Sequence, residues 1–359
     1  MKKINIAIIG CGRVGIHHAK AILKNKKFYN FSAICDLDIS KCRKLNSELK
    51  INIPIYKNYN DMLNEINIDI VSIITPSGMH FSHAKEIITC FKKNVVIEKP
   101  FVMKVSQGKE LKYLANKNDV NIFPVFQYRY NLSVQRIKSA IEKKQIGKIF
   151  LSTIRTRWNR DQSYYDRDEW RGPFSHDGGA LTNQGIHHLD LMRYLNGEVK
   201  TVYASRSTNG SIIEVEDTMI AMLEFMNGSQ GLIEITTAAR PKDFESSLSF
   251  MGKKGVAIIG GWATNEITEF TYKPSDKKKY SEKFDDVYGF GHIKLYSEIA
   301  SFLKYNTNYN CKIDDAISSI NLLHAIYISS EKNKKIKLSK NMDFKALGKT
   351  NKKIDRKYI

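Results

Sequence analysis

A lysine at the end of a predicted buried strand is the first side chain in this sequence whose position suggests chemistry. The apolar run 94–97 is rich in β-branched residues and lacks a helical period, which predicts a short strand, and Glu98-Lys99-Pro100 follows it directly. Open α/β sheets bind ligands at the carboxyl ends of their strands. A cationic Lys99 at such an edge could polarise a hydroxyl or carbonyl group, although a solvated strand-end lysine is the simpler alternative.

A histidine in the second half of the chain could serve as a base. His187 lies within the stretch 177–191, with Asn183 one helical turn before it and Asp190 one turn after it. Residues at these spacings share one face of a helix. A histidine with polar neighbours can be held in one tautomer and act near neutral pH, although a buried structural histidine has the same pattern. His188 lies roughly 100° further around the helix and is expected to be structural.

A glycine-rich turn connects the first predicted strand to the first predicted helix. Residues 4–9 form the strand, Gly10-Cys11-Gly12-Arg13-Val14-Gly15 follows, and the helix spans 16–25. This order matches the dinucleotide-binding fingerprint, in which glycines let the pyrophosphate approach the backbone and the helix N-terminus. Asp36, at the end of the second strand, stands about 20 positions further on, where an acidic residue binds the ribose hydroxyls and repels a 2′-phosphate. The sequence therefore predicts NAD rather than NADP, with a helix-capping role as the alternative for Asp36.

The first 128 residues alternate between predicted strands and helices, as a doubly wound parallel sheet requires. Further strands are predicted at 31–35, 69–74, 94–97 and 121–128, and further helices at 41–49, 61–65, 82–91 and 106–118. The strand 69–74 ends in a turn-rich loop that contains His80. No third metal ligand lies near His80 and His83, and no metal site is predicted. We expect an NAD-binding Rossmann domain over residues 1–128.

The pattern changes after a predicted amphipathic helix at 131–144. Runs of alternating polar and apolar residues occur at 149–158, 199–205, 217–225, 229–238, 246–251 and 256–260. Asn227-Gly228 between two of these runs is a hairpin signal. We expect residues 129–359 to form an α+β domain with a large open antiparallel sheet of about six strands. The helix 180–195 interrupts this sheet, and 336–338 is a candidate last edge strand.

Arginines and aromatic residues gather between the first of these strands and the histidine helix. They are Arg155, Arg157, Trp158, Arg160, Tyr164, Tyr165, Trp170 and Arg171. Planar guanidinium groups bind carboxylates or phosphates in a bidentate manner, and aromatic rings stack on sugars or bases, so the segment suits an anionic, ring-bearing ligand. The alternative is a sheet face covered by arginine side chains.

Composition limits the other classes of function. The chain of 359 residues carries a net charge of +20, but its lysines are scattered and accompany no nucleic-acid-binding motif, so we expect no nucleic-acid partner. No apolar run reaches the length of a membrane span. The five cysteines are odd in number and form no Cys-x-x-Cys pair, which indicates free thiols in a reducing, cytoplasmic compartment.

Taken together, these motifs resemble those of the Gfo/Idh/MocA oxidoreductases, the family of glucose–fructose oxidoreductase and inositol 2-dehydrogenase. The residues that carry the resemblance are the three glycines of the loop, Asp36, Thr75-Pro76 with His80, Glu98-Lys99-Pro100, Trp170-Arg171-Gly172 and the stretch 178–190. The resemblance implies a Rossmann domain followed by an α+β domain whose open sheet is commonly an oligomer interface. It thus implies a homodimer or homotetramer assembled through that sheet.

The resemblance also implies roles for single residues. Lys99 would contact the reacting hydroxyl and the nicotinamide ribose, His187 would be the general base, and Asn183 stands where many members carry an aspartate that assists the base. Expected cofactor contacts are Gly10, Gly12, Arg13, Val14, Asp36, Thr75, Pro76, His80, Glu98, Lys99, Gln127, Trp170 and Arg171. Expected substrate contacts are Lys99, Arg157, Tyr164, Asn183 and His187. A cis Lys99–Pro100 peptide is expected to turn the lysine toward the nicotinamide.

The expected reaction is hydride transfer between a ring hydroxyl and NAD. Because Asn183 cannot accept a proton, a proton relay through this position is in doubt, whereas His187 favours oxidation of an alcohol by the conventional base. The forms of the helix and of the arginine segment resemble members that act on sugars or nucleotide sugars, including oxidation at the 3-position of UDP-N-acetylglucosamine-type substrates. The alternatives are an inositol or polyol dehydrogenase, and a non-catalytic sensor that binds NAD and a sugar.

Overall fold

The computed structural model describes residues 2–284 and 286–358, and these residues form two compact units. The first unit comprises the residues up to Phe126, together with His292–Ile317 and the chain from Asn351 on. The second comprises Gln127–Gly291 and Ser318–Thr350. The sequence placed a single boundary at residue 128, whereas two later segments return to the first unit. Tyr296 helps to hold the segment His292–Ile317 in the first unit. Its backbone carbonyl accepts a hydrogen bond from the hydroxyl of Tyr29, and its side chain is fully buried.

The first unit is built on a six-stranded parallel sheet, as predicted for a Rossmann fold. Its strands run in the order β3-β2-β1-β4-β5-β6. The bounds are β1 Ile4–Ile9, β2 Tyr29–Cys35, β3 Ile55–Tyr56, β4 Ile70–Ile73, β5 Asn94–Ile97 and β6 Ile122–Pro124. The central strands are buried along nearly their whole length, which explains their almost unbroken apolar sequences. Because all strands are parallel, their carboxyl ends meet at one edge of the sheet.

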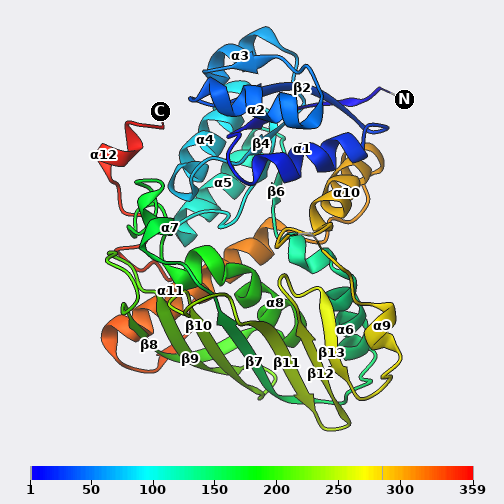
Figure 1. Cartoon of the computed structure of the whole chain (residues 1–359), viewed down its shortest axis with the longest axis vertical. Helices are drawn as coiled ribbons and strands as arrows, with labels where there is room; N and C mark the ends of the chain where they lie inside the picture. Colours follow the sequence, from blue (N-terminus) through cyan, green and yellow to red (C-terminus); the bar gives the residue numbers. More distant parts are fainter. Residues whose placement is uncertain (1, 285, 359) are drawn as a thin grey trace. The chain divides into compact units, whose positions relative to one another are not determined.

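Helices flank this sheet (Figure 1). They are α1 Gly15–Lys24, α2 Ile39–Leu49, α3 Tyr59–Glu65, α4 His80–Glu86, α5 Val105–Lys117, α10 Gly291–Tyr305 and α12 Lys352–Asp355, with a short 3₁₀ turn at Ser77–Met79. The predicted helix 82–91 is α4 in its first part and a π-helical turn, Ile87–Phe91, in its second part. Helix α10 lies beside α1, where the Asn25 side chain donates a hydrogen bond to the carbonyl of Ile293.

The last predicted strand of the first unit is shorter than expected. The sequence predicted strand over 121–128, but β6 ends at Pro124, and Gln127 begins a 3₁₀ turn, Gln127–Tyr130. Proline has no backbone N–H to continue a ladder, which accounts for the early end of the strand. Gln127 therefore lies in a turn at the start of the second unit rather than on the strand.

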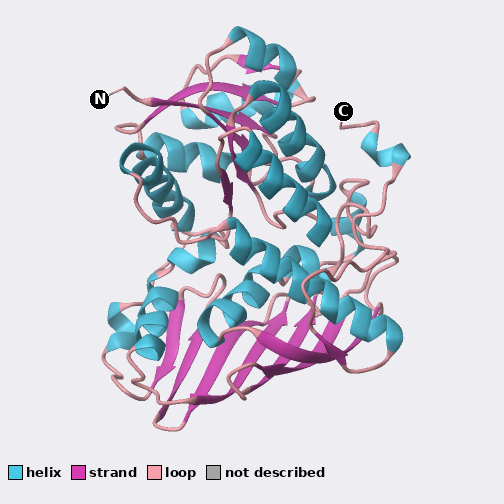
Figure 2. Ribbon diagram, turned by 180° about the vertical axis from the view of Figure 1, so that it is seen from behind, coloured by secondary structure: helices cyan, strands magenta, loops and turns pink. Residues whose placement is uncertain are grey.

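The second unit contains a broad sheet with helices against one face (Figure 2). Its eight strands run in the order β13-β12-β11-β7-β10-β9-β8-β14, and every neighbouring pair is antiparallel except β7 and β10. The bounds are β7 Ile149–Arg157, β8 Val199–Ser207, β9 Thr218–Phe225, β10 Gln230–Thr236, β11 Glu245–Gly252, β12 Gly255–Gly260, β13 Glu266–Phe270 and β14 Ile336–Lys337. The six predicted strands are present, and β14 is the edge strand that the sequence predicted.

One helix of the second unit differs from the prediction, because a π-helical turn precedes it where the sequence predicted a continuous helix. The helices are α6 Leu132–Glu142, α7 Gln162–Asp166, α8 Ile186–Asn196, α9 Asp276–Lys279 and α11 Ile313–Lys332, the last of which also contributes to the first unit. The predicted helix 180–195 is divided into a π-helical turn, Ala180–Gln184, and α8. Along the described chain, we find no helix with the length and apolarity needed to cross a membrane.

Candidate functional site

The glycine loop leaves a space that a pyrophosphate can occupy. Gly10 has a φ of +94°, and a Cβ there would lie 2.5 Å from the carbonyl oxygen of Ile74, so this position excludes any side chain. A Cβ on Gly12 would meet no atom within 4 Å, so the backbone is open on that side. Arg13 is exposed and Val14 half-buried just before α1 begins. The loop therefore fits the predicted dinucleotide phosphate site at a helix N-terminus.

Asp36 ties the end of β2 to this loop. Its Oδ2 accepts the N–H of Cys11 at 2.7 Å, and its Oδ1 accepts the N–H of Asp38 at 2.9 Å. The carboxylate is only half-buried, so its remaining lone pairs can accept hydrogen bonds from a ribose diol. No basic residue follows Asp36 directly in sequence, and the position fits NAD better than a 2′-phosphorylated cofactor.

His80 holds two backbone segments together at the same edge of the sheet. Its Nδ1 lies 2.9 Å from the carbonyl oxygen of Pro100, and its Nε2 lies 2.9 Å from the carbonyl oxygen of Thr75. Burial lowers the pKa of this imidazole, against the effect of the two carbonyls. The side chain thus links the Thr75-Pro76 loop to the tripeptide after β5, and direct contact of His80 with the cofactor stays a prediction.

The tripeptide after β5 presents its lysine and hides its glutamate. Lys99 is half-buried, whereas Glu98 is only 5% exposed. The Lys99–Pro100 peptide is cis, as predicted. Both carboxylate oxygens of Glu98 have partners within the protein, which are described below. The ends of β1, β2, β4 and β5 therefore bring the predicted cofactor residues of the first unit, and Lys99, to one edge of the sheet.

The π-helical turn before α8 begins against a buried glutamate. The Glu216 backbone oxygen accepts the N–H of Ala180 at 3.0 Å, and its Oε1 accepts the N–H of Leu181 at 3.0 Å and the hydroxyl of Tyr327 at 2.7 Å. A Cβ on Gly179 would lie 2.2 Å from Oε2 of this glutamate. Glycine at 179 thus lets the chain start the turn directly over the Glu216 carboxyl group.

Asn183 is oriented by a second buried acid, Asp177. The Asn183 amide donates to Oδ1 of Asp177, and Oδ2 of the same carboxylate accepts the N–H of Gly172. An aspartate at 183 would place a second carboxylate against Asp177, which accepts hydrogen bonds but cannot donate them when ionised. This contact gives a physical reason for asparagine where related proteins are expected to carry aspartate.

His187 lies on α8 with its ring stacked on Tyr128, at 4.4 Å between the ring centroids. Asp190, which the sequence placed on the same face, is bound elsewhere: Arg129 donates to its two oxygens at 2.7 Å each, and Ser319 donates to Oδ1. Arg129 and Asp190 are fully buried. Asp190 is therefore the counter-ion of a buried arginine, a role that helical spacing did not predict. His188 is structural as expected, because it is fully buried and bonds to Ser246 at 2.8 Å.

The arginine and aromatic segment forms one cluster in the second unit. The Arg171 guanidinium lies 4.4 Å from the ring centroids of both Tyr164 and Trp170, and it donates to the Tyr164 hydroxyl. Gln184, next to Asn183, also donates to that hydroxyl. Tyr164, Trp170 and Arg171 are thereby brought close to the turn before α8, as a substrate-binding role for Tyr164 requires.

Arg157 is separate from this cluster. Its side chain makes ion pairs with Glu234 on β10, at 2.6 Å, and Glu245 on β11, at 3.4 Å. Neighbouring Ser152, Ile154 and Thr156 alternate with it and are buried on the opposite face of β7. A contact between Arg157 and substrate stays a prediction, and the structure gives its charge other partners.

Five functional candidates were absent from the sequence-based prediction: Glu216, Asp177, Arg129, His18 and His292. Each is a polar residue within a segment that otherwise looks like core or loop, and each is at most 2% exposed. Buried charged groups are rare unless they are paired. A charged residue inside a predicted buried element could therefore have indicated these positions. The partners of such a residue lie too far away in sequence to be identified from spacing.

The buried Glu216 is expected to make the free energy of unfolding depend on pH. Burial raises the pKa of this carboxyl from 4.5 to about 8, against the hydrogen bonds from Leu181 and Tyr327. The folded protein thus keeps a proton that the unfolded chain loses, and stability falls as pH rises from about 4.5 to about 8. At about 1.4 kcal/mol per pKa unit, we expect the wild type to lose about 3 kcal/mol more than Glu216→Gln between pH 6 and pH 9. Urea unfolding at both pH values measures this difference.

The matched control for this experiment is Glu224→Gln. Ion pairs with Lys200 and Lys335 keep Glu224 ionised, and its pKa of about 2 lies far below the tested range. The control should therefore follow the wild type. Equal pH dependence of the wild type and Glu216→Gln would show that Glu216 is ionised in the folded protein at neutral pH.

Most of the chain matches two models of one oxidoreductase family, Gfo/Idh/MocA. The model of the NAD-binding Rossmann fold matches residues 4–126, and the model of the C-terminal alpha/beta domain matches residues 138–338. The two matches follow the two predicted halves of the chain.

Solved and curated proteins resemble the chain over most of its length. The structure of the WlbA dehydrogenase from Bordetella pertussis, in complex with NADH and UDP-GlcNAcA, is 33% identical with a TM-score of 0.88, over 94% of this chain and 98% of that chain. Myo-inositol 2-dehydrogenase of Thermotoga maritima is 27% identical over 70% of this chain and 74% of its own length. D-glucoside 3-dehydrogenase of Escherichia coli is 26% identical over 71% of this chain and 77% of its own length.

Proposed function

The chain belongs to the Gfo/Idh/MocA oxidoreductase family and is an NAD-dependent dehydrogenase of CH–OH groups, and from this premise we propose that it oxidises or forms a ring hydroxyl in a nucleotide sugar. The proposed substrate is of the UDP-N-acetylglucosamine type, and the proposed position is the 3-hydroxyl. The observation that carries this proposal is the 33% identity to a dehydrogenase solved with NADH and UDP-GlcNAcA, over nearly the whole of both chains.

The residues of the second unit support a substrate of this kind. Arg171 has both of its aromatic neighbours at stacking distance, and Arg160 lies 5.2 Å from the Trp158 ring centroid. Such pairs offer guanidinium groups for a diphosphate and flat surfaces for a sugar or base. Each guanidinium also has an acidic partner, Asp168 for Arg171 and Asp243 for Arg160. The excess of 57 basic over 37 acidic residues would also draw an anionic substrate toward the protein.

Each proposed catalytic residue has one task in the reaction. NAD, when bound, supplies the group that accepts or returns the hydride. In the oxidation, His187 takes the hydroxyl proton, and the Lys99 ammonium stabilises the negative charge that develops on the oxygen. Asn183, which Asp177 holds in place, orients the substrate and takes no proton itself.

A substrate panel tests the proposal. Purified protein is incubated with NAD and, separately, with UDP-N-acetylglucosamine-type nucleotides, free hexoses and inositols, and NADH formation is followed by absorbance. We expect turnover with the nucleotide sugars, and a product whose NMR spectrum places the new carbonyl at position 3. Turnover of inositols alone would instead make the chain a polyol dehydrogenase like its Thermotoga maritima relative. Tight NAD binding without turnover of any member of the panel would favour a sensor.

The proposed assembly is a homodimer or homotetramer through the outer face of the broad sheet. Tyr203, Ile220 and Met222 lie on this face and are between 37% and 56% exposed. A second copy of the chain would cover them, and molar mass in solution tests this. A cytoplasmic location remains a prediction, supported by the five cysteines, which form no disulfide among the described residues.

A further inference from the structure

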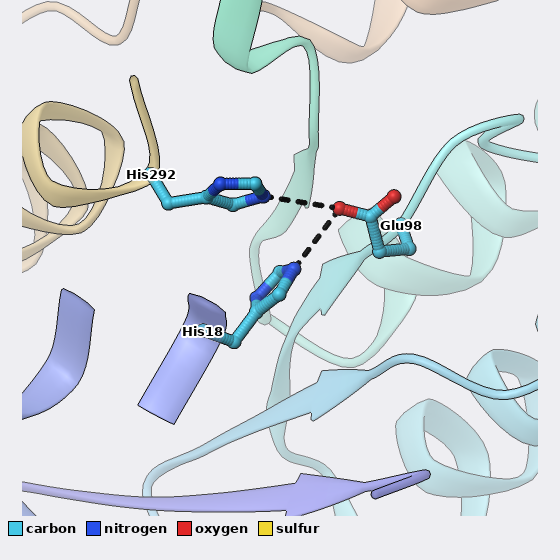
Figure 3. A group of neighbouring side chains, drawn as sticks. All are labelled: His18, Glu98 and His292. Atoms are coloured by element: carbon cyan, nitrogen blue, oxygen red, sulfur yellow. Dashed lines mark hydrogen bonds and ion pairs between the residues drawn. The ribbon is translucent and has the colours of Figure 1, made fainter. Parts of the chain in front are cut away.

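Two histidines and a glutamate meet inside the first unit, next to Lys99 (Figure 3). Nε2 of His18, on α1, lies 3.0 Å from Oε1 of Glu98, and Nε2 of His292, on α10, lies 3.4 Å from the same oxygen. The three residues are between 0% and 5% exposed. Two rings that are far apart in sequence therefore converge on one carboxylate oxygen, in a place that solvent does not reach.

The hydrogen bonds of this cluster are consistent with an ionised glutamate. Burial alone raises the pKa of the Glu98 carboxyl, but hydrogen bonds from His18 and His292 outweigh it and hold the pKa well below the usual value. A carboxylate only accepts, so both Nε2 atoms carry a proton. Nδ1 of His18 lies 2.7 Å from the Tyr296 hydroxyl, which also lies 2.7 Å from the Ser72 hydroxyl. His18 thus has a partner at each ring nitrogen.

The other oxygen of Glu98 is bound to the backbone of the lysine itself. Oε2 of Glu98 accepts the N–H of Lys99 at 2.9 Å. On the other side of the lysine, the carbonyl of Pro100 is held by His80 at 2.9 Å. Side chains therefore hold the backbone both before and after Lys99, and the first of these contacts depends on where Glu98 points.

The same set of ligands could in principle bind zinc, which is held by histidine and carboxylate groups at about 2.0–2.2 Å. Ligand atoms around a tetrahedral zinc ion lie about 3.4 Å apart, so the separations of 3.0 Å and 3.4 Å fit direct hydrogen bonds and are also close to those of a zinc site. Metal content is therefore measured as part of the test.

We propose that His18 and His292 are positioning residues that fix Glu98 and, through its bond to the Lys99 N–H, set the direction of the lysine. This inference rests on the proposed role of Lys99. It also links the dinucleotide site to the lysine, because His18 is on α1, the helix that begins directly after the glycine loop. A carboxylate without these donors would turn away or take up a proton, and the Lys99 amide would lose its acceptor.

A matched pair of variants at His18 separates positioning from packing. The amide nitrogen of glutamine can occupy the position of Nε2, so His18→Gln keeps the donor to Glu98. Asparagine reaches only the position of Nδ1, so His18→Asn loses that donor while keeping a smaller polar side chain. His292→Asn removes the second donor and serves where His18→Asn does not fold.

Besides the zinc content, three measurements are made on the full chain: deuterium uptake of a peptide that contains Lys99, the Kd for NAD, and kcat. We expect His18→Asn to gain up to about one deuteron at short times at the Lys99 amide. We also expect it to lose at least about tenfold in kcat with an unchanged Kd for NAD, because small displacements of a reacting group are costly. His18→Gln should stay near the wild type in all three.

The outcomes are distinct. Equal behaviour of His18→Asn and His18→Gln, or unchanged uptake at Lys99 in both asparagine variants, would overturn the inference. One zinc ion per wild-type chain, lost in His18→Asn, would replace it with a metal site. Deuterium uptake needs no substrate, so altered uptake in a protein that turns over no sugar would support the positioning role while contradicting the proposed function.

Discussion

Replacing His187 with alanine is expected to lower kcat by at least about 10²-fold, because general base catalysis by a positioned side chain contributes that much or more. The Kd for NAD should stay unchanged, since His187 is not among the expected cofactor contacts. The alanine side chain cannot accept a proton, so removal of the hydroxyl proton would fall to water. Steady-state kinetics with the substrate found in the panel, together with NAD titration, measure both quantities.

His187→Gln is the matched variant, because it restores a polar side chain that still cannot act as a base. Both variants should show the same loss, and a deuterium label on the reacting carbon should slow them more than it slows the wild type. The ring stacking on Tyr128 makes a structural contribution possible, so the melting temperature of each variant is measured as well. Near-normal turnover in either variant would remove His187 from the role of base.

The sequence predicted the fold well where one periodic pattern settles the structure. The runs that became β1, β4 and β5 are short, apolar and bounded by turns, and they are buried as the pattern requires. The alternating runs of the second unit became the strands of the broad sheet for the same reason, and Gly228 forms the predicted hairpin turn with a φ of +84°. Local patterns could not assign His292–Ile317 to the first unit, because that assignment depends on contacts with distant residues.

The sequence predicted those residues of the candidate site that belong to a recognisable motif, and it did not predict the residues that support them. The glycine loop, Asp36, Lys99 and His187 stand out by type and spacing, but their supporting partners do not. Asp190 is one helical turn from His187, yet its charge is matched by Arg129, which is 61 residues away in sequence. Glu98 is held by rings 80 and 194 residues away. Such pairings arise from tertiary packing, and no periodicity in one sequence encodes them.

The second large effect is expected at Lys99. We expect Lys99→Met to lower kcat by at least about 10²-fold, because methionine keeps much of the aliphatic volume but removes the charge that stabilises the developing oxyanion. The Kd for NAD should change far less than kcat. Lys117→Met is the matched control, since Lys117 is an exposed lysine on α5 of the same unit, and its loss should leave turnover intact.

The nature of the replacement tests how the lysine works. Arginine at 99 would keep the positive charge but spread it over a planar group with a different reach, so Lys99→Arg should retain more activity than Lys99→Met and less than the wild type. If charge alone were sufficient, Lys99→Arg would match the wild type, and the contacts of Glu98 and His80 on either side of the lysine would have no catalytic purpose. If Lys99→Met itself kept near-normal kcat, the lysine would be no more than a solvated residue at the end of β5, as its sequence alone allows.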